Sequence, residues 1–94
     1  MDSIRNGEVV IEDKFRTIEE MIQEAGQNKR VLRIIYTDRK GNGSWRETEP
    51  YELKDGKYFA YCLDRESIRA FKLENITSAV ITEQTYVPKW PVKF

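Results

Sequence analysis

The sequence predicts a small, mainly β domain in which one helix precedes five short strands. Two observations indicate this fold class. The spacing of apolar residues changes from a helical period of about 3.6 to a strand period of about 2 near residue 30. Short apolar runs then recur up to residue 87, separated by turns rich in Gly, Asp and Asn. Because five short strands leave exposed edges, we expect a strongly bent sheet or a closed barrel.

The length and composition indicate one folded domain with a thin core. A chain of 94 residues can build one hydrophobic core. The hydrophobic share, 39%, is low, but an aromatic share of 12% compensates because each ring buries a large area. The net charge is zero, with three basic and seven acidic side chains in residues 1–28 and a basic remainder. This mild asymmetry is far from the basic surface of a nonspecific nucleic-acid binder.

The helix is expected over about residues 13–28, after an N-terminal arm at 1–12. Four apolar residues fall on one helical face: Ile18, Met21, Ile22 and Ala25. Thr17 and Glu20 fit a capping box, and Asp13 is an alternative N-cap.

Gly26 and Asn28 are helix stop signals, and the strands are expected to follow them. The predicted strands cover 31–38, 45–53, 58–63, 68–73 and 78–87, with a break or a single 3₁₀ turn at 74–77. Asp55-Gly56 suits a type I′ hairpin turn. Pro50 cannot donate to a ladder, so its strand either bends or lies at an edge there. The barrel is expected over about 30–87, with a C-terminal tail at 88–94.

The residue types argue against an enzyme. There is no histidine, and the single cysteine, Cys62, lies in the middle of a strand with no base to activate it, so a buried filler is expected. No serine has a base partner that the sequence identifies. Spacings typical of a zinc site, a phosphate-binding glycine loop or a calcium loop do not occur. We therefore expect no catalysis, no metal and no cofactor.

The chain is expected to be a soluble, cytoplasmic protein. Its first residues lack the apolar core of a signal peptide. No run approaches the roughly 18 apolar residues that a membrane span needs, so no membrane partner is expected.

Arginines set among aromatic residues carry the functional signal. If Phe71 points into the core, alternation places Arg69 on the same face. A guanidinium there must pair with a carboxylate, reach solvent at the rim of the barrel or meet an anionic partner. In the functional interpretation, Arg69 lies at the rim beside Tyr58 or Tyr36 and offers a fork for phosphate next to a ring for stacking.

Two further arginines could join that site. Arg46 and Arg65 are the candidates, although a solvated charge is the default explanation for Arg65 in a turn. Four strand aromatics are expected in the core: Trp45, Phe59, Tyr61 and Phe71. Trp90 is expected to cap the barrel or to pack on the helix.

The run "VLRIIYTDRKGNGSWRETEPYELKDGKYFAYCLDRESIRAFKLENI" resembles the WYL domain family. The resemblance covers about residues 17–85 and rests on four pieces in order: a strand with Ile34 and Tyr36, Arg46 followed by Pro50, the triplet Tyr58-Phe59-Ala60, and a last strand with Arg69, Phe71 and Leu73. The triplet differs from the family's Trp-Tyr-Leu, and Asn75 replaces a second arginine. The chain therefore resembles a divergent, stand-alone WYL-like domain over 13–94.

The resemblance implies an Sm-like or SH3-like five-stranded barrel after one helix. WYL domains usually sit beside a DNA-binding helix-turn-helix, regulate transcription or another attached activity, and are thought to bind nucleic acid or nucleotide-like ligands. Carried over to this sequence, the binding candidates are Tyr36, Arg46, Tyr58 and Arg69. No helix-turn-helix is expected within these 94 residues.

Two functions remain open from the sequence. The first is a noncatalytic, ligand-sensing module that binds single-stranded nucleic acid or a nucleotide-like anion. The alternative is a protein-interaction or oligomerisation module of Sm-like type that pairs strand edges, with 45–53 as a plausible edge.

Overall fold

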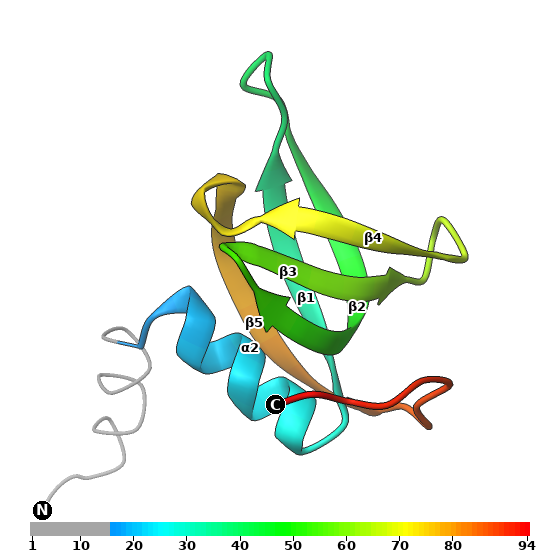
Figure 1. The fold of residues 1–94 in the computed structure, drawn as a ribbon. Helices are drawn as coiled ribbons and strands as arrows, with labels where there is room; N and C mark the ends of the chain where they lie inside the picture. Colours follow the sequence, from blue (N-terminus) through cyan, green and yellow to red (C-terminus); the bar gives the residue numbers. More distant parts are fainter. Residues whose placement is uncertain (1–15) are drawn as a thin grey trace, which may run out of the picture.

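The computed structural model describes residues 16–94, which form one helix packed against one curved antiparallel sheet (Figure 1). In chain order the elements are α2 (Ile18–Gln27), β1 (Arg30–Thr37), β2 (Gly43–Lys54), β3 (Lys57–Cys62), β4 (Ser67–Lys72), the 3₁₀ helix η1 (Leu73–Asn75) and β5 (Ile76–Thr85). The prediction of a mainly β chain with one helix before five strands is confirmed. The arm predicted at 1–12 and a helix start at residue 13 fall outside the described residues.

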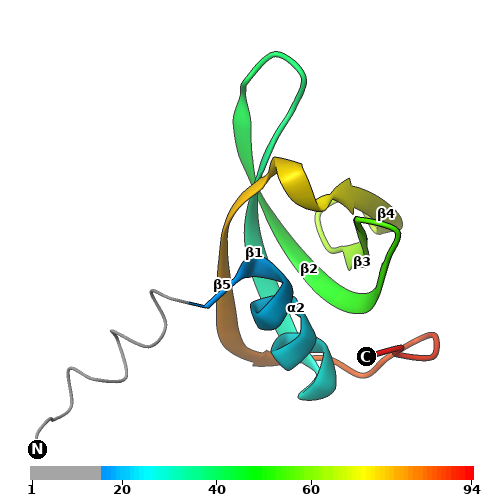
Figure 2. The same ribbon diagram turned by 60° about the vertical axis from the view of Figure 1, so that its left-hand side comes forward.

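The sheet bends strongly, and its strand order is β4-β3-β2-β1-β5. In Figure 2 the strands curve around a common interior, with α2 close to its lower end. The 3₁₀ turn at η1 carries the chain from one end of the strand order, β4, to the other, β5. No ladder joins β4 to β5 within residues 16–94, so closure into a barrel stays a prediction.

The local signals at the helix and the hairpins operate as the sequence predicts. Thr17 accepts from the amide of Glu20 and Glu20 accepts from the amide of Thr17, which completes the capping box. The turn between β2 and β3 has positive φ at Asp55 (54°) and Gly56 (75°), as a type I′ hairpin requires.

The helix runs through Gly26 rather than stopping at it, and the reason for a glycine there is packing. A Cβ built on Gly26 would lie 2.3 Å from Cδ2 of Phe94. The ring of Phe94 therefore occupies the space beside the helix that a larger residue would need. The left-handed backbone position after the helix falls instead on Lys29, with φ of 54°.

The strand that contains Pro50 lies in the centre of the sheet, so the prediction of an edge at 45–53 is wrong. The strand bends instead. β1 pairs with the first half of β2 only as far as Thr48, and the ladder from β2 to β3 shifts register between Pro50 and Glu52. Pro50 sits where the pairing with β1 has already ended, so its missing N–H costs no ladder bond.

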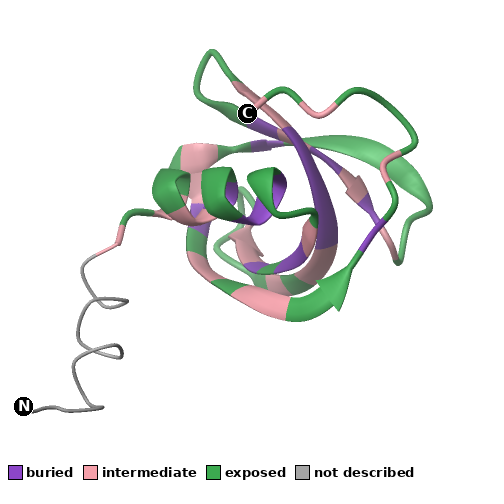
Figure 3. Cartoon of the chain, turned by 90° about the horizontal axis from the view of Figure 1, so that it is seen from below, coloured by how far each residue is buried: buried purple, intermediate pink, exposed green. Residues whose placement is uncertain are grey.

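Two clusters of apolar side chains lie on the two sides of the sheet. The inner side, on which α2 packs, carries the main core: Ile22, Ala25, Leu32, Ile34, Tyr58, Ala60, Cys62, Phe71 and Ile76. The outer side carries a smaller cluster: Val31, Tyr51 and Tyr86. Val31 and Leu32 are neighbours in β1 and enter different clusters, because successive strand residues face opposite sides. Figure 3 shows that the buried positions of the helix face the sheet.

Two tryptophan predictions need correction, and Phe59, which was expected in the core, is only partly buried and belongs to neither cluster. Trp45 is 57% exposed on the outer side, where the guanidinium of Arg33 lies over its ring, at 5.7 Å. Trp90 packs on Tyr51, with ring centroids 5.4 Å apart, rather than on the helix. Phe94 is the tail residue that reaches the helix. Both outcomes depend on which side of the sheet is covered, which the alternating pattern alone does not define.

Candidate functional site

Three of the predicted site residues project from the inner side of the sheet: Tyr36, Arg46 and Arg69. Each lies two residues along its strand from a buried inner position, namely Ile34, Thr48 and Phe71 respectively. The structure therefore gathers these side chains on one side, and β1, β2 and β4 supply one each.

Tyr36 connects the first strand to the fourth across the interior. Its ring lies edge-on to the ring of Phe71, with centroids 5.0 Å apart and planes at 71°. Strands β1 and β4 are not neighbours in the sheet, so this contact spans the curved interior. Tyr36 is half-buried.

Arg69 is exposed on the edge strand β4, opposite Ala60 of β3. Its side chain forms no ion pair or hydrogen bond with any residue of the described range 16–94. The fold therefore does not pair this guanidinium with a glutamate of the described range. The side chain keeps its five donors for solvent or for an anion.

Arg46 is held by a carboxylate that the sequence reading did not single out. Its Nη1 lies 3.3 Å from Oδ2 of Asp64, and the arginine side chain is only 17% exposed. Its Nε is buried and has no acceptor among residues 16–94. Arg65, in the turn between β3 and β4, lies 3.9 Å from the same Asp64 oxygen. One carboxylate thus faces two of the predicted cations.

The other oxygen of Asp64 accepts a hydrogen bond from Cys62, with Sγ and Oδ1 2.8 Å apart. This hydrogen bond is the main cause that lowers the pKa of Asp64. Burial opposes it, and the nearby charges of Arg46 and Arg65 add smaller lowering effects. Burial raises the pKa of the Cys62 thiol, as does its bond to Asp64. The cysteine is therefore an uncharged donor in the core, as the expected buried filler would be. The sequence feature that could have identified Asp64 is an acidic residue two positions after Cys62 and next to Arg65.

Tyr58 does not stand at the rim, and the expectation of a stacking surface there is wrong because its ring is fully buried. Its hydroxyl lies 2.8 Å from Oγ1 of Thr48, and that oxygen donates in turn to the carbonyl of Leu32 at 2.6 Å. Because the Thr48 proton is used on the carbonyl, Tyr58 is the donor of the pair. Burial raises the pKa of Tyr58 well above its ordinary value, so the phenol stays protonated in the core.

The arrangement suits recognition of an anion. β2, which carries Arg46, and β4, which carries Arg69, lie on either side of β3. The two strands are therefore two spacings apart, about 10 Å in total. Planar guanidinium groups offer paired donors to phosphate oxygens, and a tyrosine ring offers a face to a base where it is accessible. Among residues 16–94, no group of three His, Cys, Asp or Glu side chains is placed to hold a metal ion. No helix of that range is long and apolar enough to cross a bilayer.

Comparisons with known proteins agree with this architecture. The family model of the WYL domain matches residues 17–81. The chain is 37% identical over 78 residues to the uncharacterised HTH-type transcriptional regulator YobV of Bacillus subtilis (strain 168), a match that covers 79% of this chain and 25% of that protein. Among solved structures, proteasome accessory factor B/C (PafBC) of Arthrobacter aurescens matches with a TM-score of 0.62 at 17% identity. That likeness, which is one of fold, covers 98% of this chain and 15% of the other.

Proposed function

The chain belongs to the WYL domain family, and on that premise we propose that it is a noncatalytic regulatory module that senses single-stranded nucleic acid or a nucleotide-like anion. The observation that carries the proposal is Arg69. Its guanidinium is exposed on the inner side of the sheet and has no partner within residues 16–94. An exposed cation on the same side of the sheet as a half-buried tyrosine ring is a combination that can bind phosphate and base together.

The proposed roles follow from how each side chain is held. Arg69 makes the first contact with phosphate because no carboxylate of the described residues is paired with its guanidinium. Arg46 and Arg65 join when the phosphate displaces Asp64, and Tyr36 supplies the ring on which a base stacks. Tyr58 is not a contact residue in this scheme, because its ring lies in the core.

The regulatory part of the proposal draws on the relative named above. That protein is an HTH-type transcriptional regulator, and this chain spans about a quarter of its length. We infer that this chain, too, serves transcription regulation in the cytoplasm, and that it converts ligand binding into a change in an associated activity. The lack of any histidine in the sequence supports a noncatalytic role.

Fluorescence anisotropy tests the proposal with labelled single-stranded oligonucleotides, and competition with unlabelled nucleotides identifies the smallest ligand. Binding is expected to weaken with salt, with a shallow slope because few phosphates are contacted. Arg69→Ala is expected to weaken binding by about tenfold and to reduce the salt slope by about 0.7.

The matched control is Arg39→Ala, because Arg39 is an exposed arginine in the turn between β1 and β2, outside the proposed site. This variant loses the same charge and is expected to bind nearly as the unmodified chain does. Equal weakening by both variants would mean that net charge alone drives binding and would refute the site. No binding by the unmodified chain at low salt would refute the proposed ligand class.

A second function, assembly through strand edges, is favoured by one observation. β4 and β5 end the strand order, so each presents an unpaired edge among the described residues. Pairing of β4 of one copy with β5 of the next would satisfy both edges. Light scattering over a range of concentrations separates the two functions: a concentration-independent monomer that binds oligonucleotide excludes assembly through these edges.

A further inference from the structure

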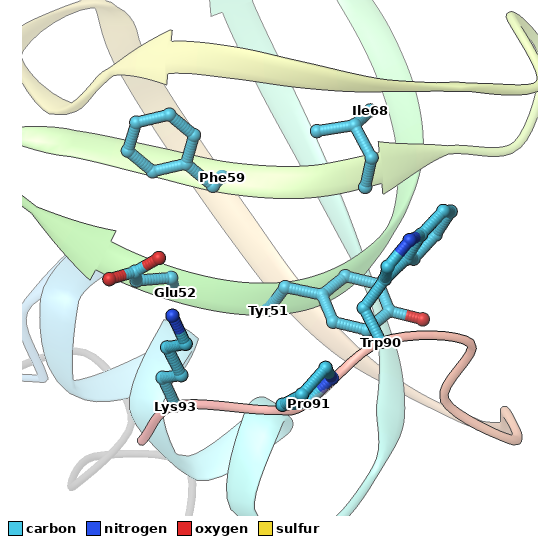
Figure 4. A pocket seen from close by; sticks show the side chains of 7 residues that line it. All are labelled: Tyr51, Glu52, Phe59, Ile68, Trp90, Pro91 and Lys93. Atoms are coloured by element: carbon cyan, nitrogen blue, oxygen red, sulfur yellow. The ribbon is translucent and has the colours of Figure 1, made fainter.

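A groove of 330 Å³ lies on the outer side of the sheet, away from the arginines (Figure 4). Its floor is formed by Phe59 of β3 and by Tyr51 of β2, and its walls by Ile68 of β4 and by Trp90 of the C-terminal tail. Ile68 directly precedes Arg69, so alternation turns the two side chains to opposite sides of the same strand. The groove is therefore a separate surface from the proposed anion site.

The walls of this groove are apolar and open to solvent. Ile68 is 43% exposed and Trp90 is 46% exposed. Trp90 is nevertheless held in place, because its ring packs edge-on to Tyr51 at 5.4 Å and lies 6.0 Å from the ring of Tyr61. Fixed, exposed apolar side chains around a hollow are typical of a small-molecule binding site.

The polar end of the groove carries one charge of each sign. The amide of Lys93 donates to the carbonyl of Tyr51 at 2.8 Å, and a short parallel bridge sets Lys93 beside Glu52. Figure 4 shows the Glu52 carboxylate and the Lys93 ammonium at the same end of the groove, below the ring of Phe59. Within residues 16–94, neither side chain forms an ion pair or a hydrogen bond. Both charges are therefore accessible to a ligand.

We propose that this groove binds a free apolar α-amino acid as its zwitterion, with an aromatic side chain fitting best. The ammonium of the ligand meets Glu52, its carboxylate meets Lys93, and its side chain lies between Ile68 and Trp90. A ligand with only one of the two charges leaves the other protein charge unpaired next to an apolar surface, which lowers its affinity. The volume is at the lower end for ligand pockets and suits a molecule of this size.

This inference goes beyond the proposed function because it concerns another side of the sheet and another ligand class. It also uses residues outside the stretch that the family model matches, since Trp90 and Lys93 follow residue 81. Failure of oligonucleotide binding would leave it untouched, and failure of amino-acid binding would leave the anion site untouched.

The test uses the intrinsic fluorescence of Trp90 in the full chain. The sequence has two tryptophans, so Trp45→Phe leaves Trp90 as the single reporter. L-Phenylalanine is expected to change this fluorescence saturably, with a Kd in about the millimolar range for so small a ligand. Phenylacetate, which lacks the ammonium, and phenethylamine, which lacks the carboxylate, are expected to bind at least about threefold more weakly. Chemical-shift changes at the amides of Phe59 and Lys93 in the unmodified chain provide an independent readout.

Charge variants assign the two ends of the ligand. Lys93→Met is expected to remove the preference for L-phenylalanine over phenethylamine, and Glu52→Gln to remove the preference over phenylacetate. Lys54→Met and Glu83→Gln are matched controls, because these exposed residues do not line the groove. The discrimination among the three ligands by the unmodified chain decides the proposal even if a variant folds poorly. Equal binding of all three, or no saturable response to L-phenylalanine, overturns it.

Discussion

The carboxylate of Asp64 lies 3.3 Å from the guanidinium of Arg46, the group that the proposed function assigns to phosphate. The same oxygen is 3.9 Å from Arg65. A bound anion must therefore compete with an internal one for two of its three arginines. Arg69 stands apart from this competition, which is why it carries the proposal.

Asp64→Asn is expected to strengthen binding of oligonucleotide or nucleotide by about threefold to fivefold, because the variant removes an exposed competing carboxylate whose ion pairs are weak. Fluorescence anisotropy at fixed salt measures the change. Glu66→Gln is the matched control, since Glu66 is an exposed acidic residue of the same turn with no ion pair among residues 16–94. Equal strengthening by both variants would contradict a specific role for Asp64.

Tyr58→Phe is expected to lower the free energy of unfolding by about 1 kcal/mol, because it leaves Oγ1 of Thr48 without its donor in a buried site. It is expected to leave anion binding unchanged.

Tyr36→Leu, in contrast, is expected to weaken oligonucleotide binding by about tenfold, since one stacked base is lost. Chemical denaturation and anisotropy measured on both variants test the pair of outcomes, and weakened binding by Tyr58→Phe would contradict the core assignment.

Glu49→Gln is expected to stabilise the chain at pH 7 by about 1 kcal/mol. Glu49 is 7% exposed, and its Oε1 has no hydrogen-bond partner among the described residues. Burial raises the pKa of this carboxyl, while Lys89 opposes the shift. The folded state therefore binds the proton more tightly than the unfolded state does, and stability falls as the pH rises from the unfolded pKa, about 4.3, through the folded pKa.

Urea denaturation of both chains between pH 4 and pH 7 measures this effect, and the variant is expected to lose that part of the pH dependence. Glu83→Gln, on the exposed end of β5, is the control and is expected to change stability little. A Glu49→Gln chain that is less stable than the unmodified chain at pH 7 would show that the carboxylate is paired in solution.

Gly26→Ala is expected to destabilise the chain by about 1–3 kcal/mol, although alanine normally stabilises a helix relative to glycine. The added Cβ would lie 2.3 Å from the ring of Phe94 and would force it away. In a Phe94→Ala background the same change is expected to be neutral or stabilising, because the clash is gone. Thermal unfolding of the four chains in this double-mutant cycle tests the contact, and a stabilising effect of Gly26→Ala alone would rule it out.

Local signals in the sequence were sufficient for the order and type of the elements. The capping box at Thr17 and the Asp55-Gly56 turn depend on residues within a few positions of one another, so sequence reading captures them. The central position of the strand with Pro50 was not accessible in this way. It depends on how far β1 extends along its neighbour, which is a tertiary property.

The candidate site was predictable in part for the same reason. Alternation along β4 correctly placed Arg69 on the side of Phe71. The sequence interpretation also set Tyr58 at the rim beside Arg69, but no local rule distinguishes a rim position from a core position on one face. The hydrogen-bond partner of the Tyr58 hydroxyl is Thr48, ten residues away, so the local sequence does not reveal this contact. The link from Asp64 to Arg46 likewise spans 18 residues.

Ile68 and Arg69 are consecutive residues of the exposed strand β4. Their side chains lie on opposite sides of one sheet, with Ile68 lining the outer groove. A rotation or shift of that strand moves both side chains together, since one peptide unit joins them. A ligand in the outer groove that moved β4 would for this reason also move the guanidinium of Arg69. With both proposed ligands bound, a sheet this thin would let one strand respond to two chemical signals.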